Sequence, residues 1–148
     1  MASYTENLVA SIRQMKESGV MADVCLKLPD NSRVSCHKLV LAAASPFFNV
    51  MLTSNFKESS QQEIKVAFSD ADTIRTTVDY FYSGNIEINL DNVGALTAAS
   101  DFLCSDHLKE ECHQVMMTLM DSSNCIKFLE LGKKYRMKEL ARKAYEYI

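Results

Sequence analysis

The sequence lacks the features that mark several large classes of protein. With only 4 Gly and 2 Pro in 148 residues, it is neither collagen-like nor a disordered linker. Its 16 Lys and Arg are outnumbered by 19 Asp and Glu, so no excess of positive charge is available for nucleic-acid phosphates. No apolar run approaches the roughly 18 residues of a membrane span, and the start has no signal-peptide pattern. We therefore expect neither a nucleic-acid partner nor a membrane.

Disulfide and catalytic signatures are also missing. The 5 cysteines are odd in number and form no C-x-x-C pair, a usage that favours the reducing cytoplasm or nucleus. There is no G-x-S-x-G elbow, P-loop, G-x-G-x-x-G or H-E-x-x-H motif, so the sequence predicts a protein without enzymatic activity.

The best metal candidate is a group of two cysteines and two histidines, namely Cys104, His107, Cys112 and His113. Cys112 and His113 are adjacent on a predicted helix, so their side chains point about 100° apart and do not readily converge on one tetrahedral ion. We therefore expect no metal and no other cofactor. In this interpretation Cys112 faces the core, whereas His107 and His113 face water.

Length and periodicity predict one domain with a small appendage and an α+β fold in which helices predominate. Ser3 and Glu6 have the capping-box spacing and Gly19 is a stop, which predicts a helix over about 4–18. The hairpin that follows brings Asp23 towards Lys38, as an ion pair or as two solvated charges. The other predicted elements are a β-hairpin over 24–36, helices over 38–44 and from Pro46, a strand over 64–68, a helix from Asp70 to Gly84, at most a short edge strand at 86–88, a helical pair opened by Asn89, and a second pair beyond Asn124.

The first predicted helix carries an apolar stripe. Leu8, Ile12 and Met15 recur on one face of a helix too exposed to serve only its own core. We expect this face to pack against a second copy of the chain in a homodimer.

The segment 45–58 has more large apolar side chains than one buried face accommodates. Helical spacing predicts one stripe and leaves a second set on a neighbouring side. The stripe is Phe47, Val50, Met51 and Ser54, and the second set is Phe48, Leu52 and Phe56. A helix wedged inside the fold explains residues 47–52, but it explains Phe56 beside Lys57 and Glu58 less well. Phe56 is therefore the candidate partner-binding residue.

The order of these motifs resembles a BTB/POZ domain. The motifs are Met21-Ala22-Asp23-Val24-Cys25-Leu26, Cys36-His37-Lys38-Leu39-Val40-Leu41-Ala42-Ala43, Ser45-Pro46-Phe47-Phe48, Tyr80-Phe81-Tyr82-Ser83-Gly84 and Ala98-Ala99-Ser100-Asp101-Phe102-Leu103. Ser123-Asn124-Cys125 and the two helices after it resemble the start of the BACK region of Kelch-like proteins. The resemblance implies a BTB/POZ domain over 1–121 and the start of a BACK region over 122–148. Because the pattern stops at Ile148 without helix-end chemistry, we expect a longer protein.

The resemblance implies a dimeric substrate adaptor of a ubiquitin ligase built on a cullin of the third type. In that family a hydrophobic residue, any residue and Glu follow the third helix, and Phe56-Lys57-Glu58 matches this pattern, with Met51 on the preceding helix as a further cullin contact. The substrate would bind through a missing C-terminal domain. Ala22 and Cys36 depart from the commoner Cys and Ala. The alternatives are the dimerisation module of a transcriptional repressor and a channel-tetramerisation module.

Overall fold

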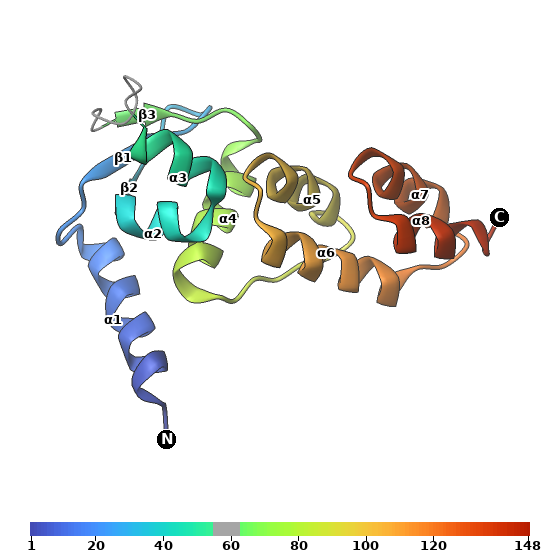
Figure 1. The fold of residues 1–148 in the computed structure, drawn as a ribbon, viewed down its shortest axis with the longest axis horizontal. Coiled ribbons are helices and arrows are strands. Elements are labelled where there is room, and N and C mark those ends of the chain that lie inside the picture. The colour runs from blue at the N-terminus through green and yellow to red at the C-terminus, as the bar shows by residue number, and fades with distance from the viewer. Residues whose placement is uncertain (55–62) are drawn as a thin grey trace. The chain divides into compact units, whose positions relative to one another are not determined.

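The computed structural model describes residues 1–54 and 63–148, which form helices and one small sheet. This arrangement confirms the α+β class (Figure 1). The chain divides into two compact units, residues 1–86 and 87–148.

The described residues of the first unit form a three-stranded sheet and four helices. Its elements are α1 (Tyr4–Ser18), β1 (Val24–Lys27), β2 (Arg33–Cys36), α2 (Lys38–Ala44), α3 (Pro46–Thr53), β3 (Glu63–Lys65) and α4 (Ala71–Ser83). The strand order is β2-β1-β3, with β2 antiparallel and β3 parallel to β1. The predicted strand over 64–68 is shorter than expected: pairing covers 63–65, and the Val66 N–H donates to the Lys27 carbonyl at 3.0 Å.

Alternation along the strands decides which side chains are buried. Val24, Leu26 and Leu28 are at most 4% exposed, whereas Cys25 and Lys27 between them are partly exposed. This period of two is the mark of a sheet with one buried face. The other buried hydrophobic side chains of this unit are Cys36, Leu41, Phe48, Ile64, Val66, Ile74, Val78 and Tyr82.

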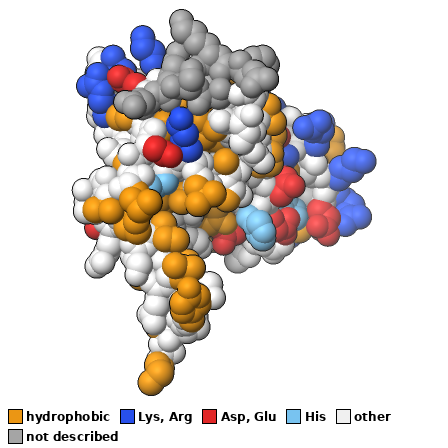
Figure 2. All heavy atoms as spheres, turned by 60° about the vertical axis from the view of Figure 1, so that its left-hand side comes forward, with side chains coloured by type: hydrophobic (Ala, Val, Ile, Leu, Met, Phe, Trp, Pro, Cys, Tyr) orange, Lys and Arg blue, Asp and Glu red, His pale blue; other side chains and the backbone are white. Residues whose placement is uncertain are grey.

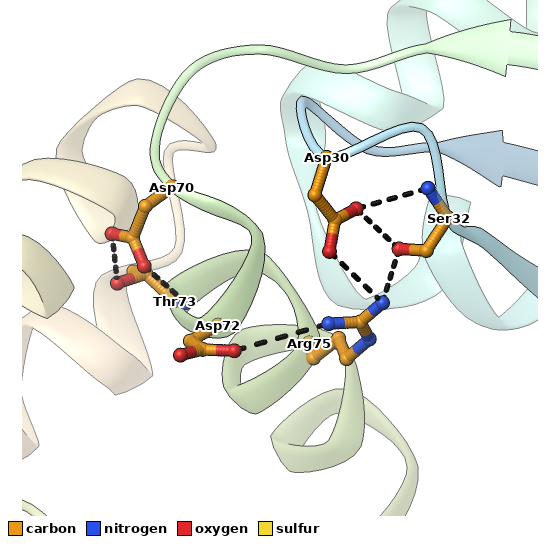
Figure 3. A network of polar contacts seen from close by, with 6 residues as sticks. All are labelled: Asp30, Ser32, Asp70, Asp72, Thr73 and Arg75. Atoms are coloured by element: carbon orange, nitrogen blue, oxygen red, sulfur yellow. Dashed lines mark hydrogen bonds and ion pairs between the residues drawn. The ribbon is translucent and has the colours of Figure 1, made fainter.

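Polar contacts fix the β1–β2 turn to α4 (Figure 3). The Arg75 guanidinium lies 3.5 Å from the Asp30 carboxylate and hydrogen-bonds to the Ser32 hydroxyl. Asp70 caps α4 by accepting from the Thr73 N–H at 3.1 Å and from the Thr73 hydroxyl at 2.6 Å. Arg75 therefore joins the turn to the helix whose start Asp70 stabilises.

Asp23 lies beside Lys38, as the hairpin predicted. Its carboxylate accepts from the backbone N–H of Lys38 at 2.7 Å. His37 is the N-cap of α2 and its side chain makes no capping bond. Asp23 therefore takes the role of a cap from a neighbouring segment.

The second unit consists of four helices. They are α5 (Val93–Phe102), α6 (Asp106–Leu119), α7 (Cys125–Lys134) and α8 (Lys138–Tyr145), with α5 packed on α6 and α7 on α8. Gly132 lets α7 approach α8 closely, because a Cβ there would lie 3.0 Å from the Ala141 nitrogen. Lys143 links α8 to α6 by donating to the Met117 carbonyl at 2.6 Å.

Residues 86–88, predicted as at most a short edge strand, form no strand in the structure. The predicted cap of α5 at Asn89 was wrong. α5 starts at Val93 with Asn92 as its N-cap, and the Asn89 side chain instead accepts from the N–H groups of Asp91 and Asn92. Asn89 thus stabilises the turn before the helix rather than its first turn.

Candidate protein-interaction surfaces

Local capping defines both ends of α1. The Ser3 hydroxyl accepts from the Glu6 N–H at 3.1 Å, as the capping-box spacing predicted. Gly19 ends the helix with φ 77°, a left-handed conformation that favours glycine. The predicted limits of this helix, Tyr4 and Ser18, are confirmed.

The C-terminal end of α1 is held against the rest of its unit. The Lys16 ammonium lies 3.7 Å from the Asp79 carboxylate and 5.6 Å from the centre of the Tyr82 ring. Just after the helix, the His37 imidazole Nε2 lies 2.8 Å from the Val20 carbonyl oxygen. The last turn of α1 is therefore anchored to α4 and to the start of α2.

A small network around Tyr82 assigns the tautomer of His37. Because the Val20 carbonyl can only accept, Nε2 must carry the proton, and Nδ1 accepts from the Tyr82 hydroxyl at 2.9 Å. The same hydroxyl oxygen accepts from the His37 backbone N–H at 2.8 Å. Burial raises the pKa of Tyr82, so the phenol stays protonated and keeps this donor.

The predicted dimer stripe lies on a helix without a single buried residue. Leu8 is 44% exposed, and Ile12 and Met15 are half-buried. Figure 2 shows hydrophobic side chains along one side of the projecting helix. An apolar face of this kind is typical of a surface that packs against a protein partner.

The apolar stripe predicted for α3 was wrong. Phe48, placed on the secondary side, is 1% exposed, whereas Val50 of the predicted stripe is 63% exposed. Ser45 is also buried and caps the helix by accepting from the Phe48 N–H at 3.3 Å. Met51 and Leu52 are half-buried. Phe56, Lys57 and Glu58 lie outside the described residues.

The cysteine and histidine group, which consists of Cys104 before α6 and three residues on α6, is split between surface and interior. Cys104 and His107 are exposed and Cys112 is fully buried, as expected for His107 and Cys112. The expectation that His113 faces water was wrong, because its residue is only 8% exposed. Across residues 1–54 and 63–148, no set of three or more His, Cys, Asp or Glu side chains is placed to hold a metal ion.

Burial suppresses ionisation of two thiols. It raises the pKa of Cys36 to about 12 and that of Cys112 to about 11. Both residues are therefore protonated at neutral pH and behave as small hydrophobic side chains. None of the helices in the described ranges combines the length and apolarity needed to cross a bilayer.

A family model confirms the resemblance to a BTB/POZ domain. The model of the BTB/POZ domain matches residues 12–120. The chain belongs to the BTB/POZ family. Domains of this family are protein-interaction modules, and the match includes Ile12 and Met15 on α1 as well as the segment that contains α3.

Curated relatives match almost the entire chain. It is 30% identical over 142 residues to "Kelch repeat and BTB domain-containing protein 8" of Xenopus tropicalis. It is 32% identical over 145 residues to "Kelch repeat and BTB domain-containing protein 12" of Homo sapiens. It is 28% identical over 144 residues to "Kelch repeat and BTB domain-containing protein A55" of Vaccinia virus. The alignments cover 96%, 98% and 97% of this chain but only 23%, 23% and 25% of the relatives. This chain therefore spans about a quarter of their length.

A solved structure has the same fold. The BTB domain of zebrafish PATZ1 superposes with a TM-score of 0.68 at 22% identity, covering 80% of this chain and 99% of that domain. At this level of identity the likeness shows the fold alone.

Proposed function

We propose that this chain is a non-catalytic, dimeric substrate-adaptor module of a ubiquitin ligase built on a cullin of the third type. The observation that carries the proposal is the exposed apolar face of α1 in a BTB/POZ domain whose relatives carry Kelch repeats. The adaptor role fits the absence of catalytic motifs in the sequence, because scaffolding requires surfaces and no reactive side chains.

In this proposal two surfaces have separate tasks. The α1 face, with Leu8, Ile12 and Met15, joins two copies of the chain. Phe56 is an aromatic anchor for an apolar pocket of the cullin, and Glu58 fixes the adjoining loop, with Lys57 between them. Met51 adds an apolar contact from α3, where it is half-buried. Residues 1–121 would act as the BTB/POZ domain and 122–148 as the start of a BACK region, with substrate bound through a C-terminal domain.

Calorimetric titration of the chain with the cullin N-terminal region tests the proposal. Phe56→Ala should weaken binding at least tenfold, about 1.4 kcal/mol, because a truncated anchor leaves an apolar pocket unfilled. Glu58→Ala should weaken binding less. Tyr147→Ala is the matched control, since Tyr147 is a 43% exposed aromatic residue far along the chain, and its affinity should be unchanged.

Thermal melts of the same variants separate binding from folding. If Phe56 is a core residue instead, Phe56→Ala should cost about 3 to 5 kcal/mol of unfolding free energy. A folded wild-type dimer that gives no heat with the cullin would refute the adaptor role. The better hypothesis would then be a homodimerisation module of a transcriptional repressor or of another oligomerising BTB protein.

A further inference from the structure

A row of three positively charged side chains crosses the outward face of the sheet. Arg33 of β2 pairs with Lys27 of β1, and Lys27 pairs with Lys65 of β3. Paired residues on neighbouring strands point to the same face, and Leu26 and Ile64, each one position earlier, are buried on the opposite face. The three cations therefore lie side by side towards solvent, with about 4.8 Å between neighbouring strands.

The charge of this row is only partly neutralised within the molecule. The three strands carry a single carboxylate, that of Glu63, which accepts a hydrogen bond from the Arg33 Nε at 3.0 Å. Lys27 and Lys65 form no ion pair among the described residues. Three cations and one carboxylate leave this face with an excess of positive charge, on a chain whose net charge is -3.

Neither stability nor protection of the sheet edges explains the whole row. Like charges directly opposite one another on a sheet are destabilising. Charged side chains on edge strands discourage edge-to-edge aggregation, which accounts for Arg33 on β2 and Lys65 on β3. Lys27, however, lies on the central strand β1, which is hydrogen-bonded on both sides and has no open edge. The position of Lys27 therefore favours a role for the row in binding negative charge.

The spacing of the row and the charge of the chain select the partner. Two carboxylates fit along three cations, each between two neighbours, and then lie about 5 Å apart. Side chains three or four residues apart on a helix have nearly this separation, about 5–6 Å between Cβ atoms, whereas same-face side chains of a strand are about 6.5 Å apart. A nucleic-acid duplex or an anionic membrane would extend beyond the row, over a chain with 19 acidic and 16 basic residues. These points favour a small acidic site on a helix of another protein.

We propose that the outward face of the sheet binds two acidic side chains, one helical turn apart, on a partner protein. One carboxylate lies between Lys27 and Arg33, and the other lies between Lys27 and Lys65. The proposal goes beyond the adaptor function, because none of these three residues is assigned to the dimer or cullin contacts. Its failure would therefore leave the proposed function untouched.

Amide chemical shifts of the isotope-labelled chain test this surface at low ionic strength, where the charge contribution is largest. The probe is an Ala- and Gln-rich peptide of about 18 residues, long enough to form a helix, with two Glu residues four positions apart. One control peptide has Gln in place of both Glu residues, and a second has the Glu residues two positions apart, where they do not face each other. The Glu peptide should shift the amides of Lys27, Arg33 and Lys65 saturably. It should bind about fivefold more tightly than the Gln peptide and about threefold more tightly than the peptide with altered spacing.

Charge reversal at the centre of the row separates binding from folding. Lys27→Glu places a carboxylate between Arg33 and Lys65, so the variant should lose saturable binding of the Glu peptide. Its unfolding free energy, measured by urea denaturation, should be at least that of the wild type, because opposite charges replace like charges across the strands. Lys138→Glu is the matched control, since Lys138 is an exposed lysine of α8 in the second unit, and this variant should keep most of the affinity.

Lys65→Gln keeps the test valid if Lys27→Glu fails to fold, because Lys65 is exposed on an edge strand. This variant should weaken the Glu peptide about threefold. Equal binding of the Glu and Gln peptides, or an equal loss in Lys27→Glu and Lys138→Glu, would overturn the proposal. Equal binding of the two Glu spacings would overturn the arrangement one helical turn apart. A lower unfolding free energy in Lys27→Glu would overturn the argument that the row serves binding. Tighter binding of duplex DNA, or of vesicles that contain phosphatidylserine, would overturn the choice of a protein partner.

Discussion

Helices α1 and α4 have the same local design but opposite surroundings. The N-caps are Ser3 for α1 and Asp70 for α4, and each cap side chain accepts a hydrogen bond from the backbone N–H three residues later. Each helix ends at a glycine with positive φ. Yet α4 buries five of its 13 residues and α1 buries none of its 15. Caps and periodicity therefore determine that a helix forms, whereas packing determines what its apolar face does.

The difference gives α1 its functional meaning. An isolated helix of this length is marginal in water, and helices in proteins gain most of their stability from packing an apolar face. α4 packs against α2 and buries five residues, while α1 is anchored mainly around Lys16. A second copy of the chain would provide for α1 what α4 already has.

The largest effect is expected from truncating the buried face of α4. Ile74 is 0% exposed, so Ile74→Ala should cost about 2 to 5 kcal/mol of unfolding free energy, measured by urea denaturation. This loss should not change with protein concentration. Leu8→Ala on α1 is the contrast. Its loss of unfolding free energy should be largest at protein concentrations where the dimer predominates and should vanish on dilution. A concentration-independent loss in Leu8→Ala would mean that Leu8 serves its own chain.

A smaller effect is expected from the two caps. Asp70→Ala should lower the unfolding free energy by about 1 kcal/mol, because Asp70 caps a packed helix. Ser3→Ala should lower it by only about a few tenths of a kcal/mol, because the first turn of α1 is exposed. Hydrogen bonds from Thr73 hold the pKa of Asp70 below its usual 3.8. Its contribution is therefore present above pH 3.8 and is lost as the pH falls through the lowered pKa.

Urea denaturation of Asp70→Ala at neutral pH and well below pH 3.8 checks this sign. The gap between wild type and variant should shrink in acid, while the gap for Ser3→Ala should not depend on pH. A gap for Asp70→Ala that widens in acid would contradict the capping role.

The smallest effect concerns the thiols in native conditions. Exposed Cys104 should react with iodoacetamide first, while Cys36 and Cys112 stay unmodified until the chain unfolds, as peptide mass spectrometry would show. Native labelling of Cys36 before Cys104 would contradict the burial argument.

The same two thiols predict a pH dependence. Since the pKa values of Cys36 and Cys112 rise from 9.0 to about 12 and about 11, the unfolding free energy should fall as pH increases above 9.

Elements with strong local signals could be predicted from the sequence. The caps at Ser3, Ser45 and Asp70 and the stops at Gly19 and Gly84 were confirmed because each depends on residues within one turn. The parallel pairing of β3 with β1, which places Leu26 beside Ile64, could not be predicted. The alternation of apolar residues predicts that each segment is a strand, but it does not identify the strand with which it pairs.

The failures concern which face of a helix is covered. α3 has only eight residues, so a short stripe does not distinguish Phe48 from Val50, and contacts from other elements decide which is buried. His113 follows the core residue Cys112, and α8 packing on α6 widens the covered arc beyond one stripe. The sequence predicts His113 at the surface only because its side chain is polar. The Phe56-Lys57-Glu58 match remains a prediction.

Sedimentation equilibrium of the chain and of Ile12→Asp tests the central claim most directly. Wild type should give about twice the chain mass of 16.7 kDa, and Ile12→Asp should shift the molecule to one chain mass, because dimerisation would bury an unpaired charge. Glu6→Asp, on the exposed N-terminal turn, is a control that should remain dimeric. A wild-type monomer at tens of micromolar, or an Ile12→Asp variant that stays fully dimeric, would contradict the account.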